Sequence, residues 1–239
     1  MAVDGQRRAW LWQRVADGAD HRSSAGWAGV VCEVAVDEID VDAVAISVRS
    51  GARVQELVTV SEVWAQELEE LQYTLGEGPG VEAFTTGGPV LVAEVHTARG
   101  RWPGFADAAG AHGLAAAFSF PLQSGAIRLG VLTLYRGRAG PLATGGLMDA
   151  AVLAELATAA LLADATGSKR ERAQWIREDS SGHYDAFNVA TGMLAAQLRI
   201  SIEEASLRLR AHAFSHNRSL LEVAQEVLRR HLSSDLFRE

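Results

Sequence analysis

The last third of the chain carries arginine, asparagine and aromatic side chains at spacings that suit contact with a nucleic acid. Asn188, Gly192, Ala195 and Arg199 follow one another at offsets of 0, 4, 7 and 11 residues, which places them on one side of a helix. Small residues let a base or another backbone approach, and asparagine and arginine can then bind it. The alternative is that Gly192 only permits close packing between helices.

A second helical pattern follows with its own polar and aromatic candidates. The apolar residues of this helix are expected to face the bundle core, which leaves two sets of residues outside it. Arg208, His212 and Ser215 run along one edge of the helix, and Leu207, Arg210 and Phe214 occupy the face away from the core. An exposed aromatic ring beside arginine suits stacking on an unpaired RNA base. The alternative is that Leu207 and Phe214 pack on the first helix or on a partner chain.

Three more arginines lie at expected helix ends or on polar faces: Arg218, Arg229 and Arg230. Arginines in such places are solvated by default, and only Arg218 joins the candidate RNA-binding residues. Loss of any arginine that neutralises a phosphate lowers the salt dependence of binding by about one unit of the log–log slope.

Three helices must position these side chains. The first is expected over about Tyr184 to Leu198, where apolar residues recur on one stripe. The next two begin after Ser201 and Ser219, each followed three residues later by glutamate in the pattern of a capping box. Short helices with short connections predict a small three-helix bundle.

The first part of the chain alternates strand patterns with helical stretches. Runs rich in β-branched residues predict a hairpin of Val41 to Val48 with Val54 to Val60, then a short exposed helix over Glu62 to Leu71. Further strands are expected at Val90 to Ala93, Ala117 to Phe120 and Leu129 to Tyr135. This order predicts an α+β domain around an antiparallel sheet.

A long helix is expected to leave this domain near Gly146. From Ala150 to Ala165, 13 of 16 residues are apolar, and such a helix must be covered on more than one side. One face can lie on the sheet, and the other is expected to meet the same helix of a second copy. The alternative is burial within its own domain. Gly167 and Ser168 should end the helix, and Lys169 to Ser181 should form a solvated connector.

The charge of the 239-residue chain is unevenly distributed. Its net charge of −8 divides into −9 for residues 1–165, with 11 arginines against 20 acids, and +1 for the remainder, with 11 basic residues against 10 acids. An acidic first part is a poor polyanion binder, whereas the second part can approach phosphate if its charges gather on one face. No signal peptide or uncharged run of 18 apolar residues is found, so we expect a cytoplasmic protein without a membrane span.

Several chemistries are excluded or disfavoured. The single cysteine, Cys32, cannot form an internal disulfide and is expected in the core. Glycines within Gly76 to Gly80 lack the lysine of a phosphate-binding loop and should form a turn. His96 and His112 lack the pattern of a metal site. We therefore expect no metal, no cofactor and no enzymatic activity, since no nucleophile, base and orienting group can be assembled.

Two stretches resemble known families. The first holds Leu71-Gln72-Tyr73-Thr74-Leu75-Gly76-Glu77-Gly78-Pro79-Gly80, Gly88-Pro89-Val90, Trp102-Pro103, Phe120-Pro121-Leu122 and Leu129 to Tyr135, and it resembles actinobacterial GAF sensor domains. The second holds Ala190-Thr191-Gly192-Met193-Leu194, Ser201 to Ala205, Leu207 to Phe214 and Val223-Ala224, and it resembles the ANTAR domain, a three-helix RNA-binding module. Where ANTAR helices commonly have glutamine before the Ala-Thr-Gly run, this chain has Val189, preceded by Asn188.

The resemblance implies a dimeric regulator of transcription antitermination. Its GAF part would sense an unidentified small-molecule or protein signal, with Trp64 and Trp102 bordering a pocket, and its ANTAR parts would bind paired RNA stem-loops in a nascent leader transcript. The expected divisions are a helical segment (1–24), a GAF-like sensor (25–145), a linking helix and connector for dimerisation (146–181) and an ANTAR-like domain (182–239). The competing hypothesis is a protein-interaction module with a structural GAF dimerisation domain and no direct nucleic-acid binding.

Overall fold

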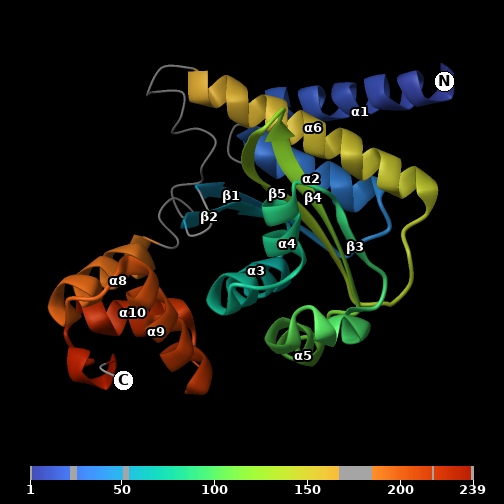
Figure 1. The fold of residues 1–239 in the computed structure, drawn as a ribbon. Helices are drawn as coiled ribbons and strands as arrows, with labels where there is room; N and C mark the ends of the chain where they lie inside the picture. The colour runs from blue at the N-terminus through green and yellow to red at the C-terminus, as the bar shows by residue number, and fades with distance from the viewer. Residues whose placement is uncertain (1, 22–25, 51–53, 167–184, 217, 238–239) are drawn as a thin grey trace.

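The chain folds into an α+β domain followed by a C-terminal bundle of three helices (Figure 1). The computed structural model describes residues 2–21, 26–50, 54–166, 185–216 and 218–237. The fold class expected from the sequence is confirmed. The predicted helix break at Gly167 and the connector from Lys169 to Ser181 lie outside the described residues.

The sheet of the α+β domain has five strands in the order β2-β1-β5-β4-β3, with every neighbouring pair antiparallel. The strands are β1 (Ala43–Ser50), β2 (Val54–Val60), β3 (Val90–Val92), β4 (Ala116–Ser124) and β5 (Ile127–Arg136). All five strands predicted from the sequence are present. Their ends differ from the predicted ends by up to four residues.

Both faces of the sheet are covered. On β5, Val131 and Tyr135 belong to one buried layer, whereas Leu132 and Leu134 belong to the other. Successive side chains of a strand point to opposite faces, so a strand covered on both sides needs apolar residues at consecutive positions. In β5, Val131, Leu132, Leu134 and Tyr135 meet that need, with the buried hydroxyl of Thr133 between them.

One face of the sheet is covered by α2 (Gly26–Glu38) and α6 (Thr144–Thr166), and α1 (Ala2–His21) packs over these two helices. Cys32 lies buried on α2, as expected, and burial raises the pKa of its thiol. In α6, Thr144–Leu162 is long and apolar enough to cross a membrane. Leu153 and Ala157 of this stretch are nevertheless buried in the layer beside the sheet, as in a core helix.

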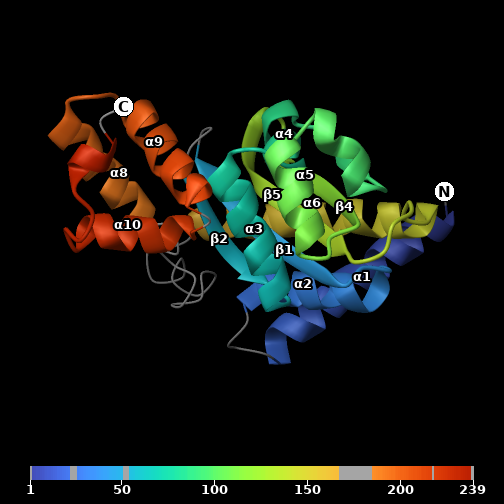
Figure 2. The same ribbon diagram turned by 90° about the horizontal axis from the view of Figure 1, so that it is seen from below.

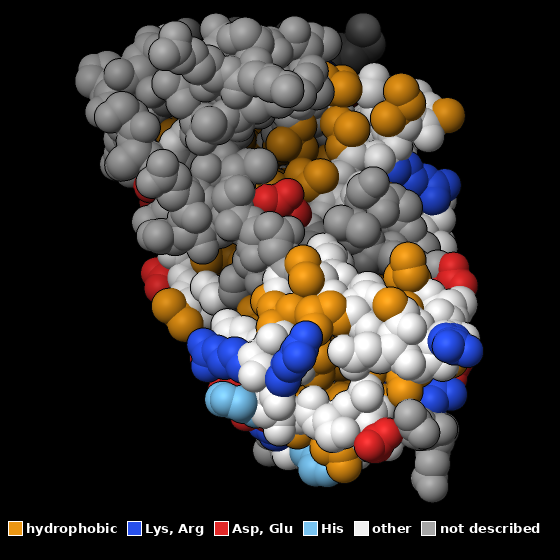
Figure 3. Space-filling view, turned by 90° about the vertical axis from the view of Figure 1, so that its left-hand side faces the viewer, with side chains coloured by type: hydrophobic (Ala, Val, Ile, Leu, Met, Phe, Trp, Pro, Cys, Tyr) orange, Lys and Arg blue, Asp and Glu red, His pale blue; other side chains and the backbone are white. Residues whose placement is uncertain are grey.

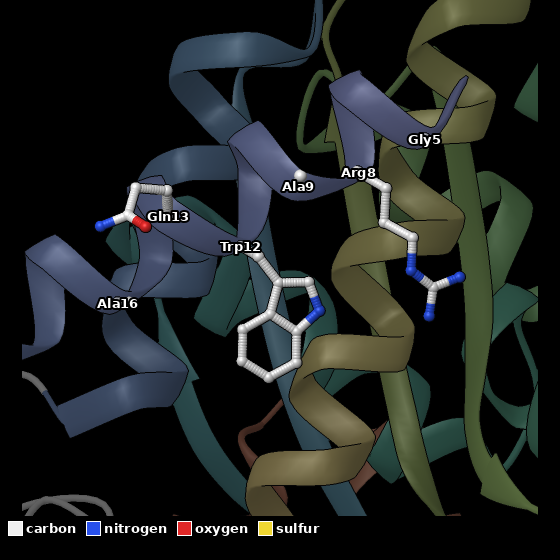
Figure 4. A pocket seen from close by; sticks show the side chains of 6 residues that line it. All are labelled: Gly5, Arg8, Ala9, Trp12, Gln13 and Ala16. Carbon is white, nitrogen blue, oxygen red and sulfur yellow. The ribbon is translucent and has the colours of Figure 1, made fainter. Parts of the chain in front are cut away.

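The side of α6 that the sequence assigns to a second copy is contacted by α1 of the same chain. An ion-pair cluster fixes this contact: the Arg7 guanidinium lies 2.8 Å from a carboxylate oxygen of Asp149 on α6 and 3.1 Å from one of Glu38 on α2. The hydrogen bond to Asp149 raises the pKa of Arg7. A second arginine, Arg8, lies 2.7 Å from Glu155 of α6. Figure 4 shows Arg8 and Trp12 on α1, which line a shallow groove of about 420 Å³.

The other face of the sheet carries α3 (Val63–Leu75), α4 (Pro79–Thr86), the 3-10 helix η1 (Val95–Gly100) and α5 (Pro103–Ala111). The helix predicted over Glu62 to Leu71 exists, but it is longer and not simply exposed, because Leu68, Glu69 and Gln72 are buried. The helices α4 and α5 were not predicted from the sequence. Each begins with proline, which suits the first helical turn because the missing N–H would have had no partner there.

The C-terminal bundle consists of α8 (Asp185–Leu198), α9 (Ile202–Ser215) and α10 (Leu220–Leu228), with a 3-10 turn η2 (Ser234–Phe237). Ser201 caps α9 as predicted, since its hydroxyl accepts the N–H of Glu204 at 3.1 Å. Ser219 also caps α10, but it accepts the N–H of Leu221 at 3.2 Å rather than that of Glu222. Its hydroxyl also donates a hydrogen bond to the Glu70 carboxylate of the α+β domain.

Candidate nucleic-acid interface

Each helix of the bundle presents one end to α3 of the α+β domain. The ring of Phe187, at the start of α8, lies edge-on to Tyr73 of α3 with 5.2 Å between centroids. Arg210, in the last two turns of α9, lies over the same Tyr73 ring. The hydroxyl of Ser219, at the start of α10, donates to the carboxylate of Glu70 on α3. We call this the docked end of the bundle; the opposite end holds the C-termini of α8 and α10 and the start of α9 (Figure 2).

At the docked end, Arg210 is enclosed by aromatic rings. Its guanidinium carbon lies 5.4 Å from the Tyr73 centroid and 5.6 Å from the Phe187 centroid. Its buried Nε has no hydrogen-bond partner among the described residues, and burial lowers the pKa of the group. A Cβ at Gly76 would lie 3.1 Å from its Nη1, so the glycine leaves room for the arginine. In this arrangement Arg210 faces the α+β domain.

Beside this contact a cleft of about 450 Å³ separates the two parts of the chain. Its walls include Glu67 and Leu71 of α3, His112 after α5, and Phe214 and Arg218 of the bundle. Phe214 is 59% exposed and Leu207 is 63% exposed. Packing of Leu207 and Phe214 on the first helix of the bundle is therefore not found within the described residues, whereas packing on a partner chain stays an open alternative.

Two candidate arginines are engaged by carboxylates of the bundle itself. Nε of Arg208 lies 2.7 Å from Oε1 of Glu204, and its Nη1 donates to the carbonyl of Phe237 at 2.5 Å. Arg218 makes a two-pronged pair with Glu226, with both N–O distances at 2.8 Å, and this hydrogen bonding raises its pKa. Their charges are thus partly compensated before any ligand arrives.

His212 stacks between His216 and the C-terminal turn. Its ring centroid lies 4.1 Å from that of His216 and 4.9 Å from that of Phe237. Burial lowers the pKa of His212, and electrostatic interaction with His216 and Arg218 lowers it further. The residue therefore favours its neutral form, which can accept as well as donate a hydrogen bond.

The outer face of α8 is open. Asn188 is half-buried, Gly192 is exposed, and Val189 is 54% exposed. No described atom lies within 4 Å of where a Cβ on Gly192 would stand, so the alternative of close packing at this glycine finds no neighbour in the part of the chain that the structure describes. Ala195 is buried, which interrupts the stripe predicted to run on to Arg199.

At the end of the bundle away from α3, arginines occupy left-handed backbone positions. Arg199 follows α8 with φ of 58° and Arg230 follows α10 with φ of 59°, and they are the only non-glycine residues with positive φ in the described ranges. Both turns are Schellman motifs, closed by Ile200 N to Ala195 O at 3.1 Å and by His231 N to Glu226 O at 2.9 Å. A left-handed conformation costs a non-glycine residue about 1–2 kcal/mol.

Inside the α+β domain, polar groups form a closed network. The Tyr135 hydroxyl donates to Glu69 at 2.7 Å, Gln72 donates to that hydroxyl at 2.7 Å, and the N–H of Gly80 donates to Gln72 Oε1 at 2.7 Å. A Cβ at Gly78 would approach Gln72 to 2.7 Å, and φ of Gly78 is 131°. The glycine run thus serves a turn packed on Gln72, consistent with the predicted structural role.

The tryptophans expected to border a pocket are both tied into the helical layer. Nε1 of Trp64 donates to the His112 carbonyl at 2.7 Å, and its ring lies edge-on to Tyr135 at 6.4 Å. Nε1 of Trp102 donates to Glu82 at 3.0 Å. Within the described residues, no group of three or more His, Cys, Asp or Glu side chains could hold a metal ion.

The structure therefore puts six of the eight sequence-predicted residues in three separate places, whereas Arg208 and His212 lie beside Phe237 of the C-terminal turn. Arg210, Phe214 and Arg218 lie near the α+β domain, Asn188 and Gly192 lie on the outer face of α8, and Arg199 lies at the far end. Sequence reasoning missed the Tyr73 and Glu70 contacts, for which no local pattern exists. It placed Arg230 at a helix end or on a polar face but did not predict its left-handed turn, because no glycine marks that turn.

Comparisons with known proteins give matches in both parts of the chain. Residues 186–228, which span most of α8 to the end of α10, match the ANTAR domain family. The α+β domain is similar to the GAF domain of a phosphoenolpyruvate-protein phosphotransferase from Coxiella burnetii, with a TM-score of 0.54 and 12% identity, covering 66% of this chain and 94% of that one. The corresponding Acinetobacter domain gives 0.52 and 12%, covering 66% and 95%. At such identities the likeness shows the fold alone. No curated protein sequence matches the chain.

Proposed function

We propose that this chain is an RNA-binding regulator of transcription antitermination, in which the GAF-like domain controls binding of the ANTAR domain to stem-loops in nascent leader RNA. The observation that carries the proposal is the coincidence of the ANTAR match with the three-helix bundle. The outer surface of that bundle holds arginines beside exposed apolar and aromatic side chains. Such a combination suits phosphates and unpaired bases together.

The charge distribution supports the same assignment. Residues 1–165 sum to −9, whereas residues 166–239 sum to +1. RNA would be repelled from the first part and admitted by the second. The candidate contacts remain Asn188, Gly192, Arg199, Arg208, Arg210, His212, Phe214 and Arg218. Of these, Arg210 can reach RNA only if the bundle leaves α3, since rings enclose it in the docked arrangement.

Paired stem-loops call for two RNA-binding bundles, so the proposal includes a homodimer. The groove on α1 and the exposed Met148 of α6 lie on the side of the molecule where helices α1 and α6 meet. The signal, which is a small molecule or a protein, would bind the GAF-like domain. It would change RNA affinity only if it favours one arrangement of the GAF-like domain and the bundle over another. No reaction is part of this function.

The test is fluorescence anisotropy of the full chain with a labelled tandem stem-loop RNA at two salt concentrations. Binding that weakens as salt rises, with duplex DNA of equal length bound more weakly, supports the proposal. Binding that does not depend on salt, or no binding at all, contradicts it. The DNA arm also separates this function from that of a helix-turn-helix regulator.

One observation favours a second candidate, a protein-interaction module. Leu207 and Phe214 are large, apolar and more than half exposed on the same helix. Exposed anchors of this kind are typical of protein interfaces. Substituting Phe214→Ala separates the two functions. A protein-interaction module loses its partner and has no RNA affinity to lose, whereas an RNA binder loses a stacking contact of about 1–3 kcal/mol.

A further inference from the structure

Helix ends in this chain show a contrast between glycine and arginine. In the α+β domain, α3 and α4 end in left-handed residues that are glycines, Gly76 with φ of 69° and Gly87 with φ of 74°. In the bundle, the equivalent positions after α8 and α10 are Arg199 and Arg230. Glycine is the residue that adopts this conformation without strain. The bundle therefore keeps a guanidinium at each of two positions where its backbone would be better served by glycine.

The side chains at these ends are exposed and uncompensated. Arg199, Arg229 and Arg230 are exposed, and no carboxylate pairs with any of them within the described residues. The other described arginines of the bundle are engaged, Arg208 by Glu204, Arg218 by Glu226 and Arg210 by two rings. The free positive charge of the described bundle is thus concentrated on these three residues.

Chain direction places the three residues at one end. Phe187 of α8 and Ser219 of α10 both contact α3, so the helices that follow them run away from the α+β domain. Arg199 lies 12 residues after Phe187 and Arg230 lies 11 residues after Ser219, which corresponds to about 18 Å and about 16 Å of helix. Figure 3 looks at this side of the bundle and shows arginine side chains at several places around hydrophobic ones.

We propose that Arg199 and Arg230, with Arg229 beside them, form a phosphate-binding surface that holds the backbone of the RNA. The proposal rests on the proposed function and adds Arg229 and Arg230 to its contacts. Two acids, Glu203 and Glu204, begin α9 at the same end, and Arg208 lies 2.7 Å from the second. Because the surface points away from α3, it is accessible while the bundle stays docked. RNA phosphates can therefore be bound before Arg210 is released from Tyr73.

A glycine variant separates this role from a structural one. Replacing both left-handed arginines, Arg199→Gly with Arg230→Gly, removes two charges and relieves the backbone at both turns. We expect a melting temperature equal to or higher than that of the unchanged chain. We also expect weaker RNA binding, with a salt slope lowered by about two. If the arginines serve mainly to stabilise the helix ends, the melting temperature falls and RNA affinity stays the same, which overturns the proposal.

Two control variants sharpen the comparison. Arg99→Gln with Arg138→Gln removes the same number of charges from exposed positions of the α+β domain and should leave the salt slope unchanged. Arg199→Lys with Arg230→Lys keeps the charges and should retain most of the slope. An equal loss in the Arg99 and Arg138 variant would mean that only net charge matters, which also overturns the proposal.

A second probe distinguishes this inference from the proposed function. Sodium polyphosphate presents phosphates without bases or stem-loops. If the chain binds polyphosphate but not RNA, and the glycine variant loses that binding, the phosphate surface stands and the antitermination function falls. If the chain binds RNA and the glycine variant binds RNA and polyphosphate equally well, the function stands and the phosphate surface falls.

Discussion

Arg210 of the C-terminal bundle lies over the ring of Tyr73 of the α+β domain, with 5.4 Å between the guanidinium carbon and the ring centroid. Phe187 completes the enclosure at 5.6 Å. A cation stacked on aromatic rings away from water is held by about 0.5–2 kcal/mol. This contact therefore links the two parts of the chain, together with the hydrogen bond from Ser219 to Glu70.

Substituting Arg210→Ala should loosen the docked arrangement. The expected result is a larger radius of gyration by small-angle X-ray scattering and faster amide hydrogen exchange along α3. The reason is the loss of the stacking contact and of the methylene stem that fills the space beside Gly76. Arg229→Ala, at the opposite end of the bundle, is the matched control. Equal behaviour of the two variants would contradict this assignment of the contact.

Substitutions at Ser219 and Glu70 should have unequal effects. Ser219 caps α10 and also donates to Glu70, so Ser219→Ala removes both a cap and the bond between domains. Loss of the cap costs about 1 kcal/mol. Glu70→Ala removes only the interdomain bond, and it should leave the melting of α10 intact. Denaturant unfolding followed by circular dichroism checks the difference, and equal losses would show that Ser219 acts only through Glu70.

Acidification should destabilise the bundle through His212. Its pKa in the folded chain lies below its ordinary value of 6.5, so the unfolded chain binds the proton more readily. The stability that the neutral ring contributes is complete above pH 6.5 and is lost as pH falls through the lower, folded value. His212→Gln removes this titration. A melting temperature that falls between pH 7.5 and 5 equally in both chains would trace the effect to other groups.

Replacing Tyr135→Phe should destabilise the α+β domain by about 1.5–3 kcal/mol, because the buried Glu69 carboxylate loses its 2.7 Å hydroxyl donor. Urea unfolding measures the change. Ser119→Ala is a useful comparison, since it removes a buried hydroxyl on the neighbouring strand whose 3.2 Å bond goes to the uncharged Thr133. A loss at Tyr135 no larger than the loss at Ser119 would mean that the carboxylate adds nothing to the network.

Local patterns explain what could be read from the sequence. The second strand, Val54–Val60, has the predicted ends because β-branched residues and a turn mark it. The cap at Ser201 was readable because the serine and its partner stand three residues apart. The helix α5 was not, because its alanines and glycines carry no clear period, and its tertiary contacts, with Phe105, Ala106 and Ala109 buried, stabilise it.

The candidate site was less readable for a different reason. The periodicity of α9 correctly placed Arg210 off the bundle core, but its enclosure depends on Tyr73, which lies 137 positions earlier. No pattern within a helix reports such a contact. The left-handed turn at Arg199 was equally hidden, since glycine is the usual marker for it. The sequence predicted which face of its helix a side chain lies on, but not which residues of the other domain surround it.

The helix α3 faces both ways. Glu69 and Gln72 point into the polar network beside Tyr135, while the next residue in each case, Glu70 and Tyr73, touches the bundle. Because a helix turns as a rigid body, α3 cannot roll about its axis on one side without moving on the other. A shift of α3 that displaces the Gln72 carboxamide therefore also displaces the ring of Tyr73, the next residue. The polar network of the α+β domain and the contact with the bundle thus share one helix, α3, of 13 residues.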